Sequence, residues 1–171
     1  MSKKITIRKA KLTDSEFLLK ILIEAVNRKF INSLKVDKKN INVWNQWLKQ
    51  KLKSEKFIIF IGKNKFQKEF GYVSFDEIIK NVFEVRIGNL PRFYGKGFGS
   101  LMLSKSIIKF LKLFKPKKII SIVKKNNIRS SKCFIKNGFK RKKINFTKHL
   151  NLKKINLKKD DYFEFIKKNK I

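Results

Sequence analysis

Three glycines alternate with larger residues in Tyr94-Gly95-Lys96-Gly97-Phe98-Gly99, a segment that we name the glycine turn. Apolar residues at helical spacing follow it from Leu101 to Phe114, so the turn is expected to lead into a helix. The first N–H groups of a helix have no acceptor within it and lie at the positive end of its dipole. Glycines let a phosphate approach these groups, and Lys96 adds a positive charge. The pattern therefore indicates an anion-binding turn or, as the alternative, only a tight connection.

Two common phosphate-binding motifs do not fit this segment. A P-loop needs a lysine followed by Ser or Thr after its last glycine, whereas Gly99 is followed by Ser100-Leu101. The dinucleotide fingerprint needs Gly or Ala where Ser100 stands. It also needs an acidic residue about 20 positions later, where this chain has Lys117-Lys118. Both motifs are excluded.

A second segment, Asn127 to Phe139, has Ser130 three residues after its first asparagine and ends in Asn137-Gly138-Phe139. Together with the glycine turn, it makes the chain resemble the GNAT superfamily of acetyltransferases over about residues 5–139. The cofactor signature of that family is Arg/Gln-x-x-Gly-x-Gly/Ala between the fourth strand and third helix, and the glycine turn matches it except at Tyr94. The second segment is similar to the family's later Asn-x-x-Ser/Ala motif ending in Gly-Phe. The resemblance implies acetyl-CoA as co-substrate, and we expect no metal.

The resemblance also implies which residues hold coenzyme A. Amides of the glycine turn would bind the pyrophosphate, and the pantetheine arm would pair with the backbone of the fourth strand, expected near 83–88. The Asn127 amide would bond the pantetheine arm or cap the next helix jointly with Ser130, and both roles stay open. The expected cofactor contacts are Val85, Ile87, Tyr94, Gly95, Lys96, Gly97, Phe98, Gly99, Ser100, Asn127 and Ser130.

Glu84 is the candidate catalytic residue. Acyl transfer from a thioester to an amine needs a neutral nucleophile, donors for the oxyanion and a proton for the thiolate. Glu84 alternates with Phe83 and Val85, so its side chain is expected on the opposite face of the strand. It resembles the glutamate with which many family members deprotonate the amine, directly or through water. The alternative is an exposed carboxylate paired with Arg86 or with a neighbouring strand.

Phe134 stands where the resemblance would place a tyrosine that acts as the general acid. That role is therefore vacant, and solvent or another hydroxyl, such as that of Tyr94, is left to protonate the thiolate. Cys133 is expected to be a small buried apolar residue rather than a nucleophile. His149 is expected at the surface.

The elements that position these residues follow from periodicity and turn signals. Strands are expected at 5–8, 57–61, 70–75, 83–87, 119–123, 142–147 and 162–166, and helices at about 13–27, 41–52, 101–114 and 129–136. A capping box, Thr13-Asp14-Ser15-Glu16, is expected to begin the first helix. The order predicts a mixed α/β (α+β) domain. The resemblance implies a mostly antiparallel twisted sheet with helices on both faces and a splayed fourth and fifth strand pair.

The length of 171 residues suits a single domain at 1–171, with the motifs at about 5–139 and C-terminal strands and a tail at 140–171. No apolar run approaches the 18 or so residues of a membrane span. The amino terminus shows no secretory signal, and the lone Cys133 cannot form an internal disulfide. We therefore expect a cytoplasmic protein with no membrane partner.

The net charge of +33 is compatible with nucleic-acid binding, but the composition offers another explanation. Lysine, rather than arginine, supplies most of the 45 basic residues, although arginine is preferred for phosphate and guanine recognition. Lys, Asn, Ile and Phe share AT-rich codons, so genome bias explains the charge without selection for binding. Nucleic acid is not an expected partner, and the chain is expected to be a monomer or homodimer.

The predicted function is transfer of acetyl from acetyl-CoA to a primary amine of a small molecule. Phe70 to Asp76 and the Ser130-x-Lys132-x-Phe134 spacing resemble the GNAT branch that acetylates amino sugars on nucleotide carriers. That branch often carries His-x-x-Trp where this chain has Trp44-Asn45-Gln46-Trp47. Two alternatives stay open. In the first, the acceptor is a protein amine, such as the terminus of a ribosomal protein. In the second, the chain is a basic nucleic-acid-binding module that kept the fold and lost catalysis.

Overall fold

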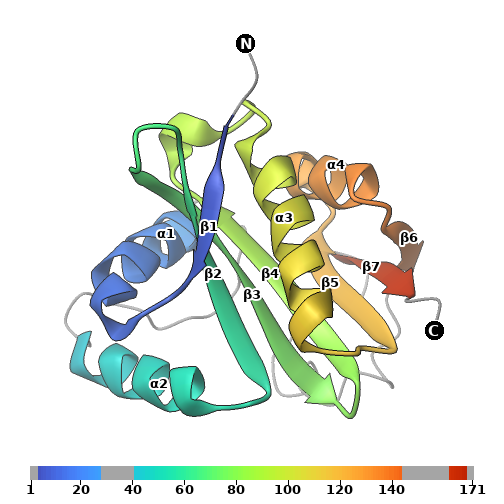
Figure 1. Ribbon diagram of the computed structural model, residues 1–171. Coiled ribbons are helices and arrows are strands. Elements are labelled where there is room, and N and C mark those ends of the chain that lie inside the picture. Colours follow the sequence, from blue (N-terminus) through green and yellow to red (C-terminus); the bar gives the residue numbers. More distant parts are fainter. Residues whose placement is uncertain (1–3, 28–40, 144–161, 169–171) are drawn as a thin grey trace.

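The structure is a computed structural model that describes residues 4–27, 41–143 and 162–168. Within these ranges a seven-stranded sheet lies between helices (Figure 1). The strands are β1 (Thr6–Lys9), β2 (Phe57–Lys63), β3 (Glu69–Ile79), β4 (Val82–Asn89), β5 (Lys118–Lys124), β6 (Lys140–Lys143) and β7 (Tyr162–Lys168). The helices are α1 (Ser15–Asn27), α2 (Ile41–Lys53), α3 (Phe98–Leu113) and α4 (Ile128–Lys136), with short 3-10 helices η1 (Leu12–Asp14) and η3 (Pro91–Phe93).

The strands lie in the order β1-β2-β3-β4-β5-β7-β6, and every described pairing except β4 with β5 is antiparallel. β4 and β5 pair over three residues each, 82–84 with 118–120. β4 then continues to Asn89 and β5 to Lys124 without further pairing to each other. The two strands therefore splay apart beyond Glu84, and the expected mixed, mostly antiparallel sheet is confirmed.

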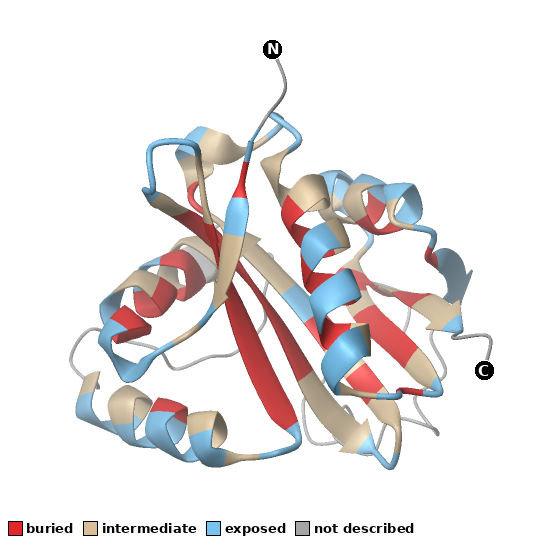
Figure 2. Cartoon of the chain, in the orientation of Figure 1, coloured by how far each residue is buried: buried red, intermediate tan, exposed pale blue. Residues whose placement is uncertain are grey.

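Two hydrophobic cores hold helices against opposite faces of the sheet. One core joins α3 and α4 to the sheet, and the other joins α1 and α2 to it. Successive β2 residues alternate between them: Phe60 belongs to the first core, whereas Ile59 and Ile61 belong to the second. Figure 2 shows β2 buried along nearly its whole length. Burial on both faces explains why this strand is a continuous apolar run.

Stacked aromatic rings fix α3 over the middle of the sheet. The ring of Phe110 on α3 lies 4.0 Å from that of Phe75 on β3 and 4.9 Å from that of Phe83 on β4. Phe110 is fully buried. Truncating such a ring to alanine typically costs about 3–5 kcal/mol, because both transfer energy and cavity volume are lost. This packing sets where the amino terminus of α3 lies relative to the end of β4.

Most element boundaries differ from the sequence-based expectation by a few residues, and three of these differences are informative. α3 begins at Phe98 rather than Leu101, because Gly97 adopts φ +78° and caps it. The capping pattern before α1 lies two residues earlier than expected. The Asp14 carboxylate accepts from the Lys11 N–H at 2.7 Å, and Asp14 N donates to Lys11 O at 3.0 Å. β3 is also longer than expected, since its pairing with β4 continues to Ile79.

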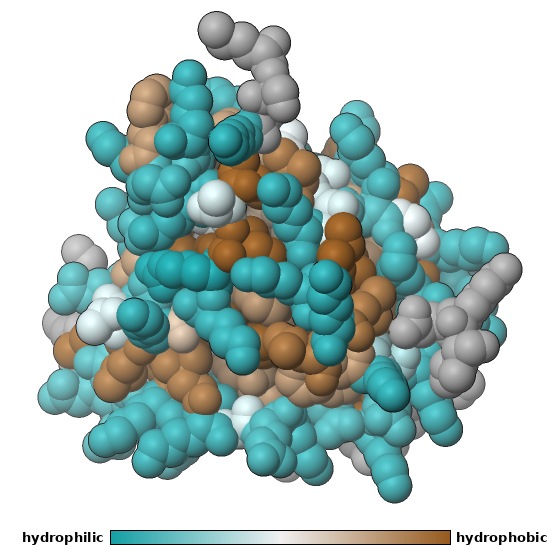
Figure 3. Space-filling view, viewed as in Figure 1, coloured by the Kyte–Doolittle hydropathy of each residue, from teal (hydrophilic) through white to brown (hydrophobic). Residues whose placement is uncertain are grey.

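The carboxy-terminal expectations are only partly covered by the described residues. β6 ends at Lys143, so the rest of the strand expected at 142–147 lies outside them, as does His149. β7 confirms the strand expected at 162–166. Among the described helices, none has the length and apolar character to cross a membrane. The face in Figure 3 is largely hydrophilic, with apolar side chains visible between the polar ones.

Candidate active site

The glycine turn leads from η3 into α3 and has the backbone that an anion cradle requires. Gly95 and Gly97 have φ of +71° and +78°, a region that residues with a side chain rarely adopt. Tyr94 N donates to Pro91 O at 3.0 Å, which closes the preceding 3-10 turn. The N–H groups of Gly99 and Ser100 belong to the first turn of α3, at the positive end of the helix dipole. The turn can therefore accept a pyrophosphate.

Asn89, the last residue of β4, packs directly against this turn. A Cβ on Gly99 would lie 2.6 Å from Asn89 Nδ2, and a Cβ on Gly71 would overlap Asn89 Oδ1. Asn89 Oδ1 is buried, and no hydrogen-bond partner for it is found among the described residues. The absence of side chains at both glycines is what allows the end of β4 to approach the start of α3 so closely.

An asparagine stands at each end of α4, and the one at its carboxyl end ties the helix to the same region. At its carboxyl end, Asn137 Nδ2 donates to Ser100 Oγ at 3.0 Å and to Cys133 O at 2.9 Å. At its amino end, Asn127 Oδ1 accepts from Ser130 N at 3.1 Å. The capping role of Asn127 is therefore confirmed, and its NH2 group and the second lone pair of Oδ1 remain for other contacts. Gly138, with φ +78°, adopts the left-handed conformation that is common directly after a helix.

A positive charge from α4 lies beside the first residue of the glycine turn. The guanidinium carbon of Arg129 is 5.4 Å from the centroid of the Tyr94 ring. Tyr94 is the one position at which the turn departs from the family signature, which has Arg or Gln there. The structure thus brings a guanidinium to this position from another element.

Glu84 occupies the point at which β4 and β5 separate. It is the last β4 residue paired with β5, opposite Ile120. Its carboxylate accepts from Arg86 Nη2 at 2.5 Å and from Arg86 Nε at 3.3 Å. The Glu84 side chain is 15% exposed and that of Arg86 is 50% exposed. The pairing with Arg86 that the sequence offered as an alternative is present, whereas the carboxylate is more enclosed than that alternative implied.

Further polar groups of β3 lie beside these two residues, because Ser74 pairs with Arg86 and Asp76 with Glu84 in the sheet. We call Ser74, Asp76, Glu84 and Arg86 the polar patch. Lys51 of α2 neutralises Asp76 with contacts of 2.8 and 2.9 Å. Burial raises the pKa of the adjacent Tyr72 to about 12, against the smaller opposing effect of the Arg86 charge. The Tyr72 hydroxyl therefore stays protonated at neutral pH.

Several other residues considered from the sequence lie in the cores or pack at their edges. Phe134 is 1% exposed and packs on Phe139 and Phe165 at ring distances of 5.1 and 5.7 Å, so its position is filled by packing. Burial raises the pKa of Cys133 to about 12, which agrees with an unreactive thiol. Trp44 packs against the second core and stacks at a ring distance of 4.9 Å on Trp47, which is 39% exposed.

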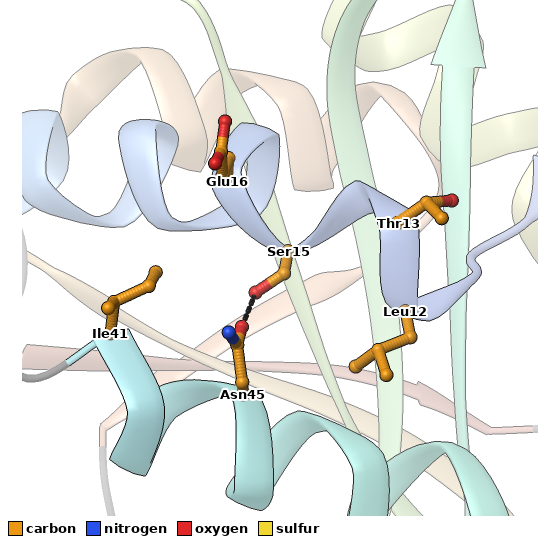
Figure 4. A pocket seen from close by; sticks show the side chains of 6 residues that line it. All are labelled: Leu12, Thr13, Ser15, Glu16, Ile41 and Asn45. Atoms are coloured by element: carbon orange, nitrogen blue, oxygen red, sulfur yellow. Dashed lines mark hydrogen bonds between the residues drawn. The ribbon is translucent and has the colours of Figure 1, made fainter.

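A pocket of about 260 Å³ lies between the first turns of α1 and α2 (Figure 4). Ser15 and Asn45 point toward each other across it and share a hydrogen bond, with Leu12 and Ile41 at its sides. None of its lining residues belongs to β4, the glycine turn or α4. The pocket is therefore separate from the residues that the sequence predicted for acyl transfer.

Sequence reasoning missed three contacts at this site, which are those of Asn89 with Gly99, Asn137 with Ser100, and Arg129 with Tyr94. Each joins residues of different elements, so no local periodicity indicates it. The Glu84–Arg86 pair could be predicted from the sequence, since residues two apart in a strand share a face. The cofactor contacts expected at Val85 and Ile87 lie on the splayed part of β4, where the backbone is not paired to β5.

Comparison with known proteins identifies the family of this fold and site. The sequence model described as "Acetyltransferase (GNAT) domain" matches residues 4–140, which is well over half of the chain. A search of curated protein sequences gives no significant match.

Solved structures share the fold over nearly the whole chain. A domain from Methanocaldococcus jannaschii is 21% identical with a TM-score of 0.73, covering 98% of this chain and 100% of that one. A mutant form of the spermidine N-acetyltransferase SpeG from Vibrio cholerae is 16% identical with a TM-score of 0.73, covering 96% and 93%. A dodecameric structure of the Vibrio cholerae enzyme is 17% identical with a TM-score of 0.71, also covering 96% and 93%. At these identities the likeness concerns the fold.

Proposed function

Because the chain belongs to the GNAT acetyltransferase family, which uses acetyl-CoA as its co-substrate, we propose that it acetylates the primary amine of a small molecule with Glu84 as the general base. The observation that carries this proposal is the position of Glu84 at the splay of β4 and β5, on the strand whose last residue, Asn89, packs against the glycine turn. The cofactor's binding turn and the candidate base are thus linked by one strand.

The residues present fit coenzyme A. The amides of the glycine turn and Ser100 would hold the pyrophosphate at the amino terminus of α3. The backbone of Val85 and Ile87, which pairs with β3 but not with β5, would pair with the amides of the pantetheine arm. The Asn127 side-chain NH2 group would bond the same arm from the start of α4. Gly95, Gly97 and Gly99 keep side chains out of the cradle.

The chemistry assigned to Glu84 is removal of a proton from the acceptor ammonium, directly or through water. The neutral amine then forms a C–N bond to the acetyl carbon as the C–S bond breaks, and the nitrogen loses its second proton to solvent. The phenyl ring of Phe134 cannot donate a proton, so solvent or the Tyr94 hydroxyl protonates the departing thiolate. The thiol of coenzyme A is acidic enough that its thiolate can leave without a dedicated general acid.

The acceptor class includes amino sugars on nucleotide carriers, to which the segment Phe70 to Asp76 points by resemblance. The SpeG structures are named for spermidine, so polyamines belong in the same acceptor panel. The family match favours catalysis over a nucleic-acid-binding module without activity. No described contact favours a protein amine over a small one.

Two measurements test the proposal. Isothermal calorimetry should show that coenzyme A binds. If no binding is seen with coenzyme A at millimolar concentration, the assignment of coenzyme A as the cofactor is wrong. In a preparation that turns over an amine, Glu84→Gln should lower kcat by about 10²–10⁴-fold, the usual contribution of a general base, while coenzyme A still binds. Arg141→Gln, at an exposed position on β6, serves as the control. Unchanged turnover in Glu84→Gln would contradict the role of the base but not the family.

A further inference from the structure

Glu84, the proposed base, is already engaged by a cation. Arg86 Nη2 and Nε contact its two carboxylate oxygens at 2.5 and 3.3 Å. Both side chains leave the same face of β4, because they are two residues apart. A carboxylate held in this bidentate way has to exchange a guanidinium contact before it can receive a proton from an acceptor.

Arg86 is the more accessible partner of the pair. Its side chain is 50% exposed, against 15% for Glu84. The neighbouring carboxylate, Asp76, does not compete for Arg86 at contact distance, because it pairs with Lys51 at 2.8 Å. An incoming molecule therefore reaches the guanidinium more easily than the carboxylate behind it.

We propose that the acceptor is an amine that also carries a phosphate or carboxylate group, and that Arg86 binds this anion and so releases Glu84 to act as the base. The inference rests on the proposed function. The guanidinium exchanges Glu84 for the acceptor's anion while Glu84 receives the acceptor's ammonium, so no charge is left uncompensated beside the strand. Glu84 then takes one proton from the acceptor ammonium, the C–N bond forms as the thioester C–S bond breaks, the nitrogen gives its second proton to solvent, and the thiolate takes a proton from solvent.

The charge of the site agrees with this acceptor class. The polar patch with Lys51 contains two carboxylates and two cations, so it offers no surplus negative charge to a polycation. The chain as a whole carries a net charge of +33, which repels polyamines and attracts anionic molecules. An acceptor with an anionic group therefore has favourable interactions both at long range and at Arg86.

The test compares amines that differ in an anionic group, with coenzyme A release as the readout. Glucosamine 6-phosphate is compared with glucosamine to test the effect of a phosphate group, and tyrosine is compared with tyramine to test that of a carboxylate. Spermidine is included as a polycation without an anionic group. In the wild type, kcat/KM should favour the anionic member of at least one pair by about tenfold or more, equivalent to about 1.4 kcal/mol. The pair that shows the preference identifies which anion Arg86 binds.

The decisive variant is Arg86→Gln, with Arg141→Gln as the matched control on the exposed strand β6. Arg86→Gln should lose the preference, because activity on the anionic amine falls more than activity on its uncharged partner. The control should keep the preference. A wild type without any charge preference, or a preference that survives Arg86→Gln, would overturn the inference.

Coenzyme A binding separates the possible failures. If Arg86→Gln binds coenzyme A like the wild type, its fold is intact and its acceptor profile can be read directly. If that variant does not fold, each amine of a pair is instead titrated into the wild-type protein bound to coenzyme A. The anionic amine should bind more tightly than its uncharged partner. If the wild type does not bind coenzyme A, the proposed function fails and this inference fails with it.

Discussion

The guanidinium of Arg129, in the first turn of α4, lies 5.4 Å from the centre of the Tyr94 ring at the start of the glycine turn. Stacking on an aromatic face holds an arginine while leaving its N–H groups available to an anion. The pair thus places a guanidinium beside the turn, where the family signature has its own Arg or Gln.

Arg129→Gln should therefore weaken coenzyme A binding by about tenfold, corresponding to loss of one charge-assisted contact of about 1.4 kcal/mol. Calorimetry at two salt concentrations measures this loss, which should shrink as salt screens the charge. Lys136→Gln removes the same charge from an exposed position of the same helix and should have a much smaller effect. Equal losses in the two variants would mean that only overall charge matters.

Gly99→Ala should be harmful in this chain although the family signature accepts alanine at that position. Its Cβ would lie 2.6 Å from Asn89 Nδ2, so the start of α3 or the end of β4 would have to shift. Overpacking of this kind costs about 1–3 kcal/mol in the free energy of unfolding.

A double-mutant cycle in urea tests whether Asn89 is the cause. In an Asn89→Ala background the obstructing amide is gone, so Gly99→Ala should be neutral or stabilising, since alanine is favoured over glycine in helices. The same cost in both backgrounds would assign the strain to another neighbour.

Acid should destabilise the protein through Asp14. Burial alone would raise the pKa of Asp14, but hydrogen bonds from Arg8 and from the Lys11 backbone outweigh burial and hold the pKa below its usual value of 3.8. A lowered folded-state pKa stabilises the fold fully above the unfolded value, and this stabilisation is lost as pH falls through the folded value. The loss therefore lies below about pH 3.8.

Asp14→Asn should remove this part of the acid dependence and cost about 1–3 kcal/mol of unfolding free energy at pH 7, because Arg8 loses its charged partner. Urea denaturation from pH 7 to pH 2 measures both effects. Glu16→Gln, at an exposed neighbouring position, is the control and should leave the acid dependence in place. An Asp14→Asn curve parallel to that of the wild type would contradict the prediction.

Cys133 should react slowly with thiol reagents in the folded protein. Burial raises its pKa to about 12, with a smaller opposing effect of Lys136, so very little thiolate forms at pH 8. Labelling with a disulfide reagent should be fast in denaturant and slow without it, and the native rate should still rise above pH 9. Rapid native labelling at pH 8 would show that the thiol is more accessible than this packing allows.

The sequence by itself determined the order of elements, the glycine turn and the side of β4 that carries Glu84. These follow from local rules: periodicity reports which face is buried, and glycines at short spacing indicate backbone conformations that other residues avoid. The left-handed residue at Gly138 and the cap at Asn127 were predictable for the same reason, since each depends on residues within a few positions.

Only the tertiary structure decided which polar groups meet. Asn137 reaches Ser100 across 37 positions, and Arg129 reaches Tyr94 from another helix. Asp14, rather than the expected Thr13 and Glu16 pair, organises the start of α1 because Arg8 on β1 binds it. Such partners depend on strand register and helix rotation, which are set by packing of the two cores. For the glycine turn, the sequence therefore predicted the cradle, and the fold decided which side chains surround it.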